Sequence, residues 1–267
     1  MGKDICKTGK TRPSATNGDY SFTWQGNRTG FIPEQGRQGY AGKKTSQNHL
    51  PLVLLHYLLA ISCLLLLSHP VKAEQVVLDQ LHFDHIKFKR VKPNTVTFHD
   101  GTISFEVNET ASFMLHAFED ARSVSRVAFD WKANGKLNKR DVEHETTRKG
   151  DDAWLRVGLI LKGEPQLLDP LVPSWVKQVR NTLKYPSDEM VYLVPDARHA
   201  PGKSWPSPFS KQIRMISVAS STEKENGWRS VNYVSPQPLQ VIGIWLMADG
   251  DNTQSSFRSS IRKLQVQ

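Results

Sequence analysis

The sequence predicts an all-β fold, a jelly-roll-like antiparallel β-sandwich of about 8–10 strands with one short helix. Three observations support this fold class. Apolar residues after Ala73 alternate with period two, turn residues separate these segments, and a single segment has helical spacing. Many short strands joined by turns are typical of sandwiches, whereas alternating α/β folds place a helix between successive strands.

Residues 1–49 form a leader that we expect to be disordered. This stretch holds eight of the 17 glycines and has few aliphatic residues. Such a composition cannot bury enough apolar surface to offset the entropy lost when the chain becomes ordered. Because signal peptides seldom carry so long an N-terminal region, a wrongly assigned start site is an alternative explanation for the leader.

Residues 50–73 have the features of a secretory signal peptide. Lys43 and Lys44 precede an apolar run from Leu50 to Leu67, and small residues end at Ala73. This order predicts cleavage after Ala73 and export to the periplasm or the extracellular space. The run is marginal for a membrane span, which needs about 20 apolar residues, so an uncleaved anchor and a buried helix are the alternatives. As an anchor, Leu50 to Leu67 would be the only membrane contact and would leave the C-terminal part outside the cytoplasm.

The remaining residues, 74–267, are expected to form a single, nearly neutral domain. Residues 1–73 carry nine Lys or Arg and three Asp or Glu, whereas residues 74–267 carry 26 and 23. The domain therefore lacks the basic patch that marks proteins binding nucleic acid. Cys6 and Cys63 both precede residue 74, so the domain has no disulfide and no thiol nucleophile. Lipidation of Cys63 is disfavoured, because the apolar run continues beyond it.

The strands are predicted from alternation and turn residues. Val96-Thr97-Phe98 leads through His99-Asp100-Gly101 into Thr102 to Val107, a pattern that indicates a hairpin with an Asp-Gly turn. Further alternating segments predict the strands Ser112–Phe118, Arg126–Lys132, Ala153–Leu161, Met190–Val194, Gln212–Ala219, Trp228–Tyr233, Leu239–Ala248 and Ser259–Val266. Helical spacing of apolar residues predicts a helix from Trp175 to about Leu183, capped by Ser174.

One predicted strand carries a candidate ligand-binding face. Alternation along Ala153–Leu161 places Asp152, Trp154 and Arg156 on the face opposite the core residues Ala153, Leu155, Val157 and Leu159. An aromatic ring beside an acid and a guanidinium can present a stacking surface and hydrogen bonds to a sugar. The alternative is an ion pair that anchors a corner of the sandwich.

Oxygen-bearing residues follow another apolar strand and suggest a cation site. Asp249, Asp251 and Asn252 come directly after Val241 to Met247, and their oxygens could bind a hard cation such as calcium. The EF-hand pattern does not match this segment. A tight turn is the alternative, because Asp, Gly and Asn are the residues that turns favour.

Six tryptophans fall in residues 74–267, and most of them must be buried. Burying one removes about 150–250 Å² from water. An exposed tryptophan would therefore signal a binding surface. Trp154 is expected to be exposed from strand alternation, and Trp205 from its place in the Pro-rich loop Pro195 to Pro208.

Several short motifs resemble, in the same order, those of the bacterial domain of unknown function numbered 3047. They are Phe129-Asp130-Trp131-Lys132, Gly150-Asp151-Asp152 with Arg156, Gly227-Trp228, and Ile242-Gly243-Ile244 leading to Asp249-Gly250-Asp251-Asn252-Thr253. The resemblance spans about Phe83 to Val266. It implies an exported bacterial protein and no particular reaction. Phe129 stands where the family tends to have the first residue of Trp-x-Trp.

These features favour a non-catalytic module of the cell envelope that binds a glycan or a similar polar ligand. Asp152, Trp154, Arg156 and Trp205 would contact the ligand, and Asp249, Asp251 and Asn252 would hold any cation. A second hypothesis is an enzyme acting on glycans, with Asp152 and Asp251 as its acid and base. A third is a structural or partner-binding envelope protein, in which the acidic residues only pair with Arg156 and its basic neighbours.

Overall fold

The protein is described by a computed structural model that covers residues 73–165 and 173–267. The described residues belong to one compact unit. The predictions of a disordered leader at 1–49 and a signal segment ending at Ala73 concern residues outside the described part of the chain. Within that part, no helix is long and apolar enough to cross a membrane.

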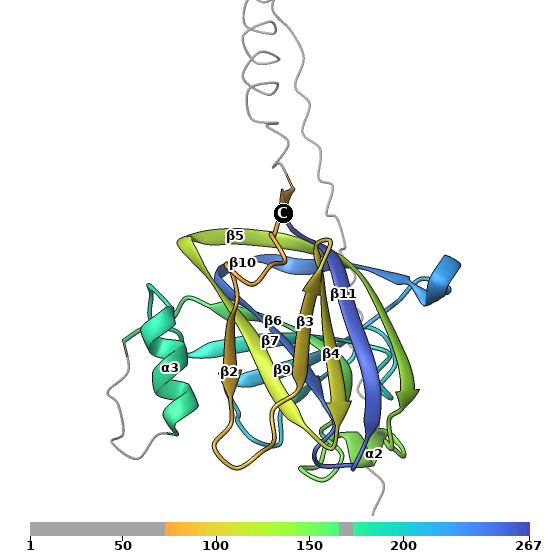
Figure 1. Ribbon diagram of the computed structural model, residues 1–267. Coiled ribbons are helices and arrows are strands. Elements are labelled where there is room, and N and C mark those ends of the chain that lie inside the picture. Colours follow the sequence, from red (N-terminus) through yellow and green to blue (C-terminus); the bar gives the residue numbers. More distant parts are fainter. Residues whose placement is uncertain (1–72, 166–172) are drawn as a thin grey trace, which may run out of the picture. The chain divides into compact units, whose positions relative to one another are not determined.

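The described residues form one 11-stranded sheet, which confirms the predicted all-β, jelly-roll-like fold (Figure 1). The strands are β1 Glu74–Gln75, β2 Asp84–Lys87, β3 Thr95–His99, β4 Thr102–Asn108, β5 Ala111–Lys136, β6 Ala153–Leu161, β7 Glu189–Pro195, β8 Ser204–Pro206, β9 Ile213–Val218, β10 Arg229–Asp249 and β11 Ser256–Val266. Their order is β3-β4-β11-β5-β10-β6-β7-β9-β8, with β1 paired to β11 and β2 paired to β5.

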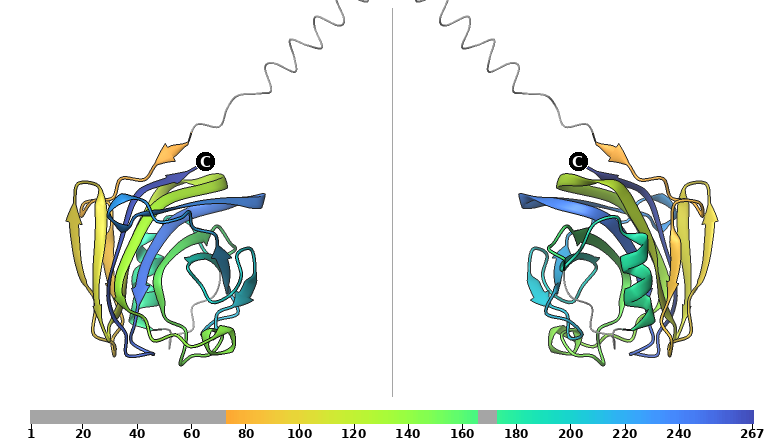
Figure 2. Two further views of the ribbon diagram at one scale, coloured as in Figure 1. Left: turned by 90° about the vertical axis from the view of Figure 1, so that its right-hand side faces the viewer. Right: turned by 90° about the vertical axis from the view of Figure 1, so that its left-hand side faces the viewer.

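Two long strands connect the halves of the sandwich. β5 contains both Ser112–Phe118 and Arg126–Lys132, and β10 contains Leu239–Ala248 and all of Trp228–Tyr233 except Trp228. They pair with each other along most of their length, with register shifts between Val234 and Leu239 and between Val241 and Gly243. The sheet curls so that β3, β4 and β11 lie opposite β6, β7 and β9 (Figure 2). Each pair of predicted strands is therefore one continuous bent strand.

The predicted hairpin forms as expected. β3 and β4 pair antiparallel, and Phe98 lies opposite Ile103. Asp100 and Gly101 have φ angles of 47° and 66°. Positive φ at both turn residues gives the turn the twist that two-residue hairpins prefer.

One pair of strands departs from the predicted antiparallel arrangement. β7 and β9 are parallel, with Tyr192 opposite Met215. Their connection, from Asp196 to Gln212, contains the short strand β8, which pairs antiparallel with β9. A long connection is what allows a strand to return in the same direction.

The predicted helix is α3, Ser174–Thr182, and its expected N-terminal cap is wrong. Ser174 is the first helical residue, whereas Pro173 occupies the cap position without a side-chain hydrogen bond. Two further short elements were not predicted. They are α2, Val142–Glu145, which Asp141 caps by accepting from the His144 amide, and a 3₁₀ turn at Glu225–Gly227.

Apolar residues are buried on both faces of the half of the sheet that consists of β10, β6, β7 and β9. The sandwich core, between the two halves, includes Phe105, Trp131, Leu159 and Leu246. The outer-face cluster lies on the opposite face and consists of Ile86, Ala111, Phe113, Leu115, Ala153, Ile160, Val179, Leu183, Tyr192, Val194, Trp205, Met215, Ile242, Trp245 and Met247. Since Val179 belongs to α3, the helix helps to cover this outer face.

Candidate functional site

A cavity of about 560 Å³ adjoins the outer-face cluster beside α3. Its volume lies within the range of about 300–1,000 Å³ that is common for ligand pockets. The wall includes Trp175 of α3, Tyr192 of β7 and Trp245 of β10, together with Asp251 and Asn252 from the turn after β10. The cavity therefore combines aromatic rings with polar side chains.

The aromatic wall of the cavity is tightly packed. Trp245 is 3% exposed and stacks on Phe113 with ring centroids 3.3 Å apart. Trp175 meets Trp245 edge to face at 5.9 Å, and Phe88 meets Trp175 edge to face at 5.7 Å. Trp175 is half-buried, so part of its ring remains open to a ligand.

Arg156 and two acidic residues form a buried ion-pair group on the same wall. The guanidinium Nη1 lies 2.6 Å from Asp249 Oδ2, and Nη2 lies 3.2 Å from Asp151 Oδ1. Burial opposes the positive charge, but the carboxylates of Asp151 and Asp249 outweigh this effect and raise the pKa of Arg156. Burial also raises the pKa of Asp151. Arg156 therefore stays charged and holds this wall together.

Asp152 fixes the turn that follows β10. Its Oδ2 accepts hydrogen bonds from the Thr253 amide at 2.7 Å and the Thr253 hydroxyl at 2.6 Å. Its Oδ1 accepts from the Asn252 amide at 3.3 Å and from Asn252 Nδ2 at 3.2 Å. Asp152 is 0% exposed. Because both of its oxygens serve the turn, Asp152 positions Asp251 and Asn252.

Asp249 and Asp251 meet at the end of β10. One oxygen from each of Asp152, Asp249 and Asp251 lies within 4.8 Å of the other two. Asp249 Oδ1 is buried and accepts no hydrogen bond from the described residues. Burial raises the pKa of Asp249 well above its ordinary value, and the nearby Asp152 and Asp251 carboxylates add to this effect while Arg156 opposes it. Such a pair can hold a proton or a cation.

The residues of the predicted cation site do lie together. Asn252, however, uses its amide nitrogen to donate to Asp251 Oδ1 at 2.9 Å, in addition to Asp152. Asp152 is the third member of the acidic cluster; the sequence suggested it as a partner of Asp251 in catalysis but not as a cation ligand. Binding of calcium here stays a prediction.

The predicted common face of Asp152, Trp154 and Arg156 does not form. The register of β6 against β10 shifts between Arg156, opposite Met247, and Ala153, opposite Asp249. Ala153 consequently joins the outer-face cluster, whereas Trp154 packs edge to face on Phe257 at 4.8 Å, against the sandwich core. Trp154 is half-buried and does not line the cavity.

The prediction that Trp205 is exposed is also wrong. Its side chain is 6% exposed and stacks on the His199 ring at 4.0 Å. The strand β8 turns the expected loop tip inward against β9. Trp205 thus belongs to the outer-face cluster.

Trp175 is a site residue that the sequence did not reveal, as are Tyr192 and Trp245 of the same wall. The spacing of Trp175 with Val176 and Val179 indicated only the apolar side of a helix. In the fold, Val179 is buried whereas Trp175 remains half-buried at the first turn of α3. No local signal identified it, because helical spacing is the same for a ring that borders a cavity and for one in the core.

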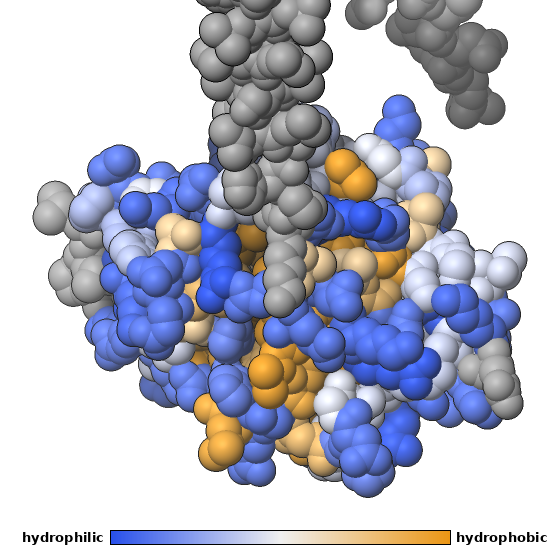
Figure 3. Space-filling model, turned by 90° about the horizontal axis from the view of Figure 1, so that it is seen from above, coloured by the Kyte–Doolittle hydropathy of each residue, from blue (hydrophilic) through white to orange (hydrophobic). Residues whose placement is uncertain are grey.

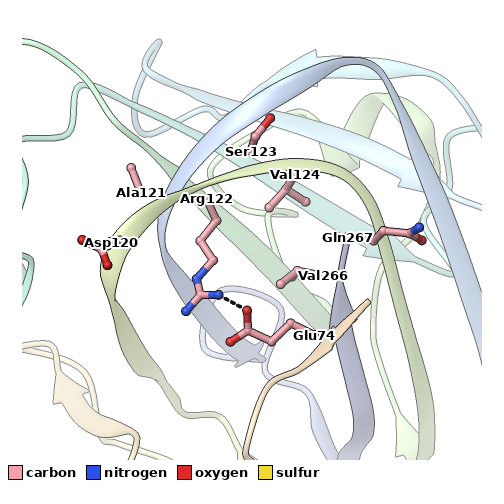
Figure 4. A pocket seen from close by; sticks show the side chains of 8 residues that line it. All are labelled: Glu74, Asp120, Ala121, Arg122, Ser123, Val124, Val266 and Gln267. Atoms are coloured by element: carbon pink, nitrogen blue, oxygen red, sulfur yellow. Dashed lines mark ion pairs between the residues drawn. The ribbon is translucent and has the colours of Figure 1, made fainter. Parts of the chain in front are cut away.

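A smaller hollow of about 350 Å³ lies near the C terminus (Figure 4). This end of the fold shows a mostly hydrophilic face with a smaller apolar area (Figure 3). Arg122 forms an ion pair with Glu74 in the hollow and lies over the Phe118 ring. None of the residues that line it is aromatic. We therefore assign the candidate site to the larger cavity.

A family model described as "Protein of unknown function (DUF3047)" matches residues 82–265. No protein with a curated description matches the chain.

Similarity to solved structures is weak. The family 11 carbohydrate-binding module from Clostridium thermocellum, in complex with a β-1,3-1,4-mixed-linked tetrasaccharide, has 10% identity and a TM-score of 0.36, covering 74% of this chain and 96% of that one. The family 11 xylanase from Neocallimastix patriciarum has 12% identity and a TM-score of 0.31, covering 74% and 96%. A family 29 carbohydrate-binding module has 12% identity and a TM-score of 0.27, covering 73% and 89%. Scores this low carry no inference about ligand or function.

Proposed function

The chain belongs to the family of proteins of unknown function DUF3047, and we propose that it binds a glycan or a similar hydroxylated ligand in the cavity beside Trp175. In this proposal it acts as a non-catalytic binding module.

The observation that carries the proposal is the pairing of an open aromatic ring with accessible polar groups in one cavity. Trp175, Asp251 and Asn252 are all half-buried and line the same space. The carbon-bound hydrogens of a sugar ring pack on an aromatic face, and its hydroxyls donate to carboxylates. A purely apolar ligand would remove water from the Asp251 carboxylate without supplying a hydrogen-bond donor, which is costly.

The hydrolytic alternative requires Asp152 and Asp251 to act as acid and base. Glycoside hydrolysis needs two carboxyl groups that flank the scissile bond. Asp152 is fully buried, and each of its oxygens accepts two hydrogen bonds from the turn. This arrangement favours a positioning role for Asp152 and supports binding over hydrolysis.

The purely structural alternative accounts for only part of the wall. Asp151 and Asp249 do pair with Arg156, as that hypothesis expects. Asp251 forms no ion pair with a described basic residue and remains half-buried. A carboxylate that lines a cavity without forming an ion pair can bind a ligand, whereas it contributes no ion pair to the stability of the fold.

A glycan panel tests the proposal. Calorimetric titration of the full chain with neutral and amino-bearing oligosaccharides should reveal at least one ligand. Trp175→Ala should weaken its affinity about tenfold or more, a difference of about 1.4 kcal/mol. Trp154→Ala is the matched control, because Trp154 is also half-buried but packs outside the cavity. Absence of binding across the panel, or equal losses in the two variants, would refute the proposal.

We also propose that the protein works outside the cytoplasm of a bacterial cell. The support is the segment from Leu50 to Ala73, with its basic residues before an apolar run. Cell fractionation followed by N-terminal sequencing tests this location. A chain that remains in the cytoplasm with residues 50–73 intact would contradict it.

A further inference from the structure

Carboxylates outnumber basic groups at the polar end of the cavity. Asp151, Asp152, Asp249 and Asp251 are gathered there, and Arg156 is the described cation that pairs with two of them. The buried Lys139 forms its ion pair with Glu145 instead. Lys89 and Arg90 line the outer part of the cavity, but both are exposed, so water and salt screen their charges.

Hydrogen bonds and ion pairs leave three carboxylate oxygens at this end without a donor among the described residues. Both oxygens of Asp152 are used by the turn, Asp249 Oδ2 by Arg156, and Asp251 Oδ1 by Asn252. Asp151 Oδ1 pairs with Arg156, so Asp151 Oδ2, Asp249 Oδ1 and Asp251 Oδ2 remain. Asp249 is 4% exposed and its Oδ1 has no N–H donor, so this oxygen is satisfied either by a proton that Asp249 shares with Asp251 or by an added cation.

The number of open oxygens favours an ammonium group over a metal ion. Calcium takes six to eight oxygen ligands. An ammonium group has only three hydrogen atoms to donate, and two acceptors plus a ligand-borne or water oxygen satisfy them. The guanidinium of Arg156, 2.6 Å from Asp249, repels a divalent ion more strongly than a monovalent one.

The aromatic rings beside the acidic residues suit an organic cation as well. Trp175, Trp245 and Tyr192 line the same cavity as Asp249 and Asp251. Trp245 stacks on Phe113 and the Tyr192 ring already lies under Arg156, so the half-buried Trp175 is the ring available to a ligand. An indole face attracts an ammonium group without requiring a full shell of oxygens. A hydrated metal ion would gain nothing from these rings.

We infer that the acidic end of the cavity, Asp249 and Asp251, binds the ammonium group of an amino sugar. This inference rests on the proposed function, since it takes the cavity to bind a hydroxylated ligand and specifies its chemistry. Asp251, which is half-buried, receives the ammonium directly, and Asp249 lies behind it. The rest of the sugar packs against Trp175.

Two trimers with one skeleton test the inference: glucosamine trimer, which carries ammonium groups at pH 6, and N-acetylglucosamine trimer, which does not. Calorimetry with the full chain should show binding of the glucosamine trimer that is about tenfold or more tighter, the effect of one charge-assisted hydrogen bond. Asp251→Asn should remove this preference, because it should weaken binding of the glucosamine trimer about tenfold more than binding of the neutral trimer. Asp120→Asn, at the smaller hollow, is the matched control and should keep the preference.

The outcomes separate the inference from the proposed function. Equal binding of the two trimers, or a preference that survives Asp251→Asn, overturns the ammonium site but leaves glycan binding intact. A calcium-dependent rise in melting temperature that is lost in Asp251→Asn, with no preference between trimers, overturns it in favour of a metal site. Failure of every saccharide to bind overturns both.

Discussion

Arg156 Nη1 lies 2.6 Å from Asp249 Oδ2, and the two side chains are only 3% and 5% exposed. Arg156→Met should therefore lower the free energy of unfolding by about 3–5 kcal/mol, because it leaves Asp249 and Asp151 buried without their cation. Urea unfolding of the full chain measures the loss. Arg258→Met is the control, since Arg258 pairs with Glu106 at 2.9 Å with both side chains about half exposed. It should cost about 1 kcal/mol or less, and equal costs would contradict the assignment.

Asp152 should matter chiefly for the turn after β10. Asp152→Asn turns one acceptor oxygen into a donor that faces the donors of either Asn252 or Thr253, so we expect a loss of about 1–3 kcal/mol in unfolding free energy. Hydrogen exchange at the Asn252 and Thr253 amides should accelerate more than exchange in β4. If exchange at those two amides were unchanged, Asp152 would not be what positions the turn.

Stability at acid pH should depend on a buried group near α2. Burial disfavours the charge on Glu145, but Lys139 Nζ at 2.6 Å and a hydrogen bond from His199 outweigh burial and lower the pKa of Glu145. A depressed pKa contributes stability that is present above the unfolded value and lost as pH falls through the folded value.

Glu145→Gln should consequently reduce the loss of unfolding free energy between about pH 5 and pH 3, although it lowers stability at pH 7. Urea titrations at several pH values measure this slope. Glu143→Gln, on the same helix but exposed, should retain the slope of the unmodified chain. The interpretation fails if the two variants have the same slope.

Gly158 lies against two residues of the cavity wall. A Cβ atom at this position would lie 2.9 Å from Trp245 Cβ and 2.9 Å from a carbon of the Tyr192 ring. Gly158→Ala should therefore cost about 1–3 kcal/mol in stability and weaken ligand binding, since it displaces two residues of the cavity wall. Gly135→Ala is a control that crowds Phe257 instead. It should destabilise the fold without changing affinity.

Local alternation in the sequence located the strands, but it did not show which segments join into one continuous strand. Local alternation marked Ala153–Leu161 with the bounds of β6. The two segments within β5 looked separate because polar residues near Asp120 interrupt the apolar pattern where the strand bends. Local patterns cannot show that a bent strand continues into the other half of a sandwich, since this depends on partners such as β10 and β11.

Residue composition identified the charged residues of the candidate site, but strand alternation assigned Trp154 to the wrong face. Asp152, Arg156, Asp249 and Asp251 do gather at one end of a cavity. The predicted orientation of Trp154 was wrong because the register shift in β6 interrupts the alternation of side chains between the two faces. Such a shift cannot be recognised from a single sequence. Trp175 was missed because helical spacing cannot distinguish a ring that faces the core from one that borders a cavity.

The most direct test of the account is a crystal structure of the full chain with a saccharide identified by calorimetry. The account predicts a sugar ring packed against Trp175, with a hydroxyl or ammonium group within hydrogen-bonding distance of Asp251. A saccharide bound elsewhere, such as in the hollow beside Arg122, with the Trp175 cavity free of it, would contradict the central claim.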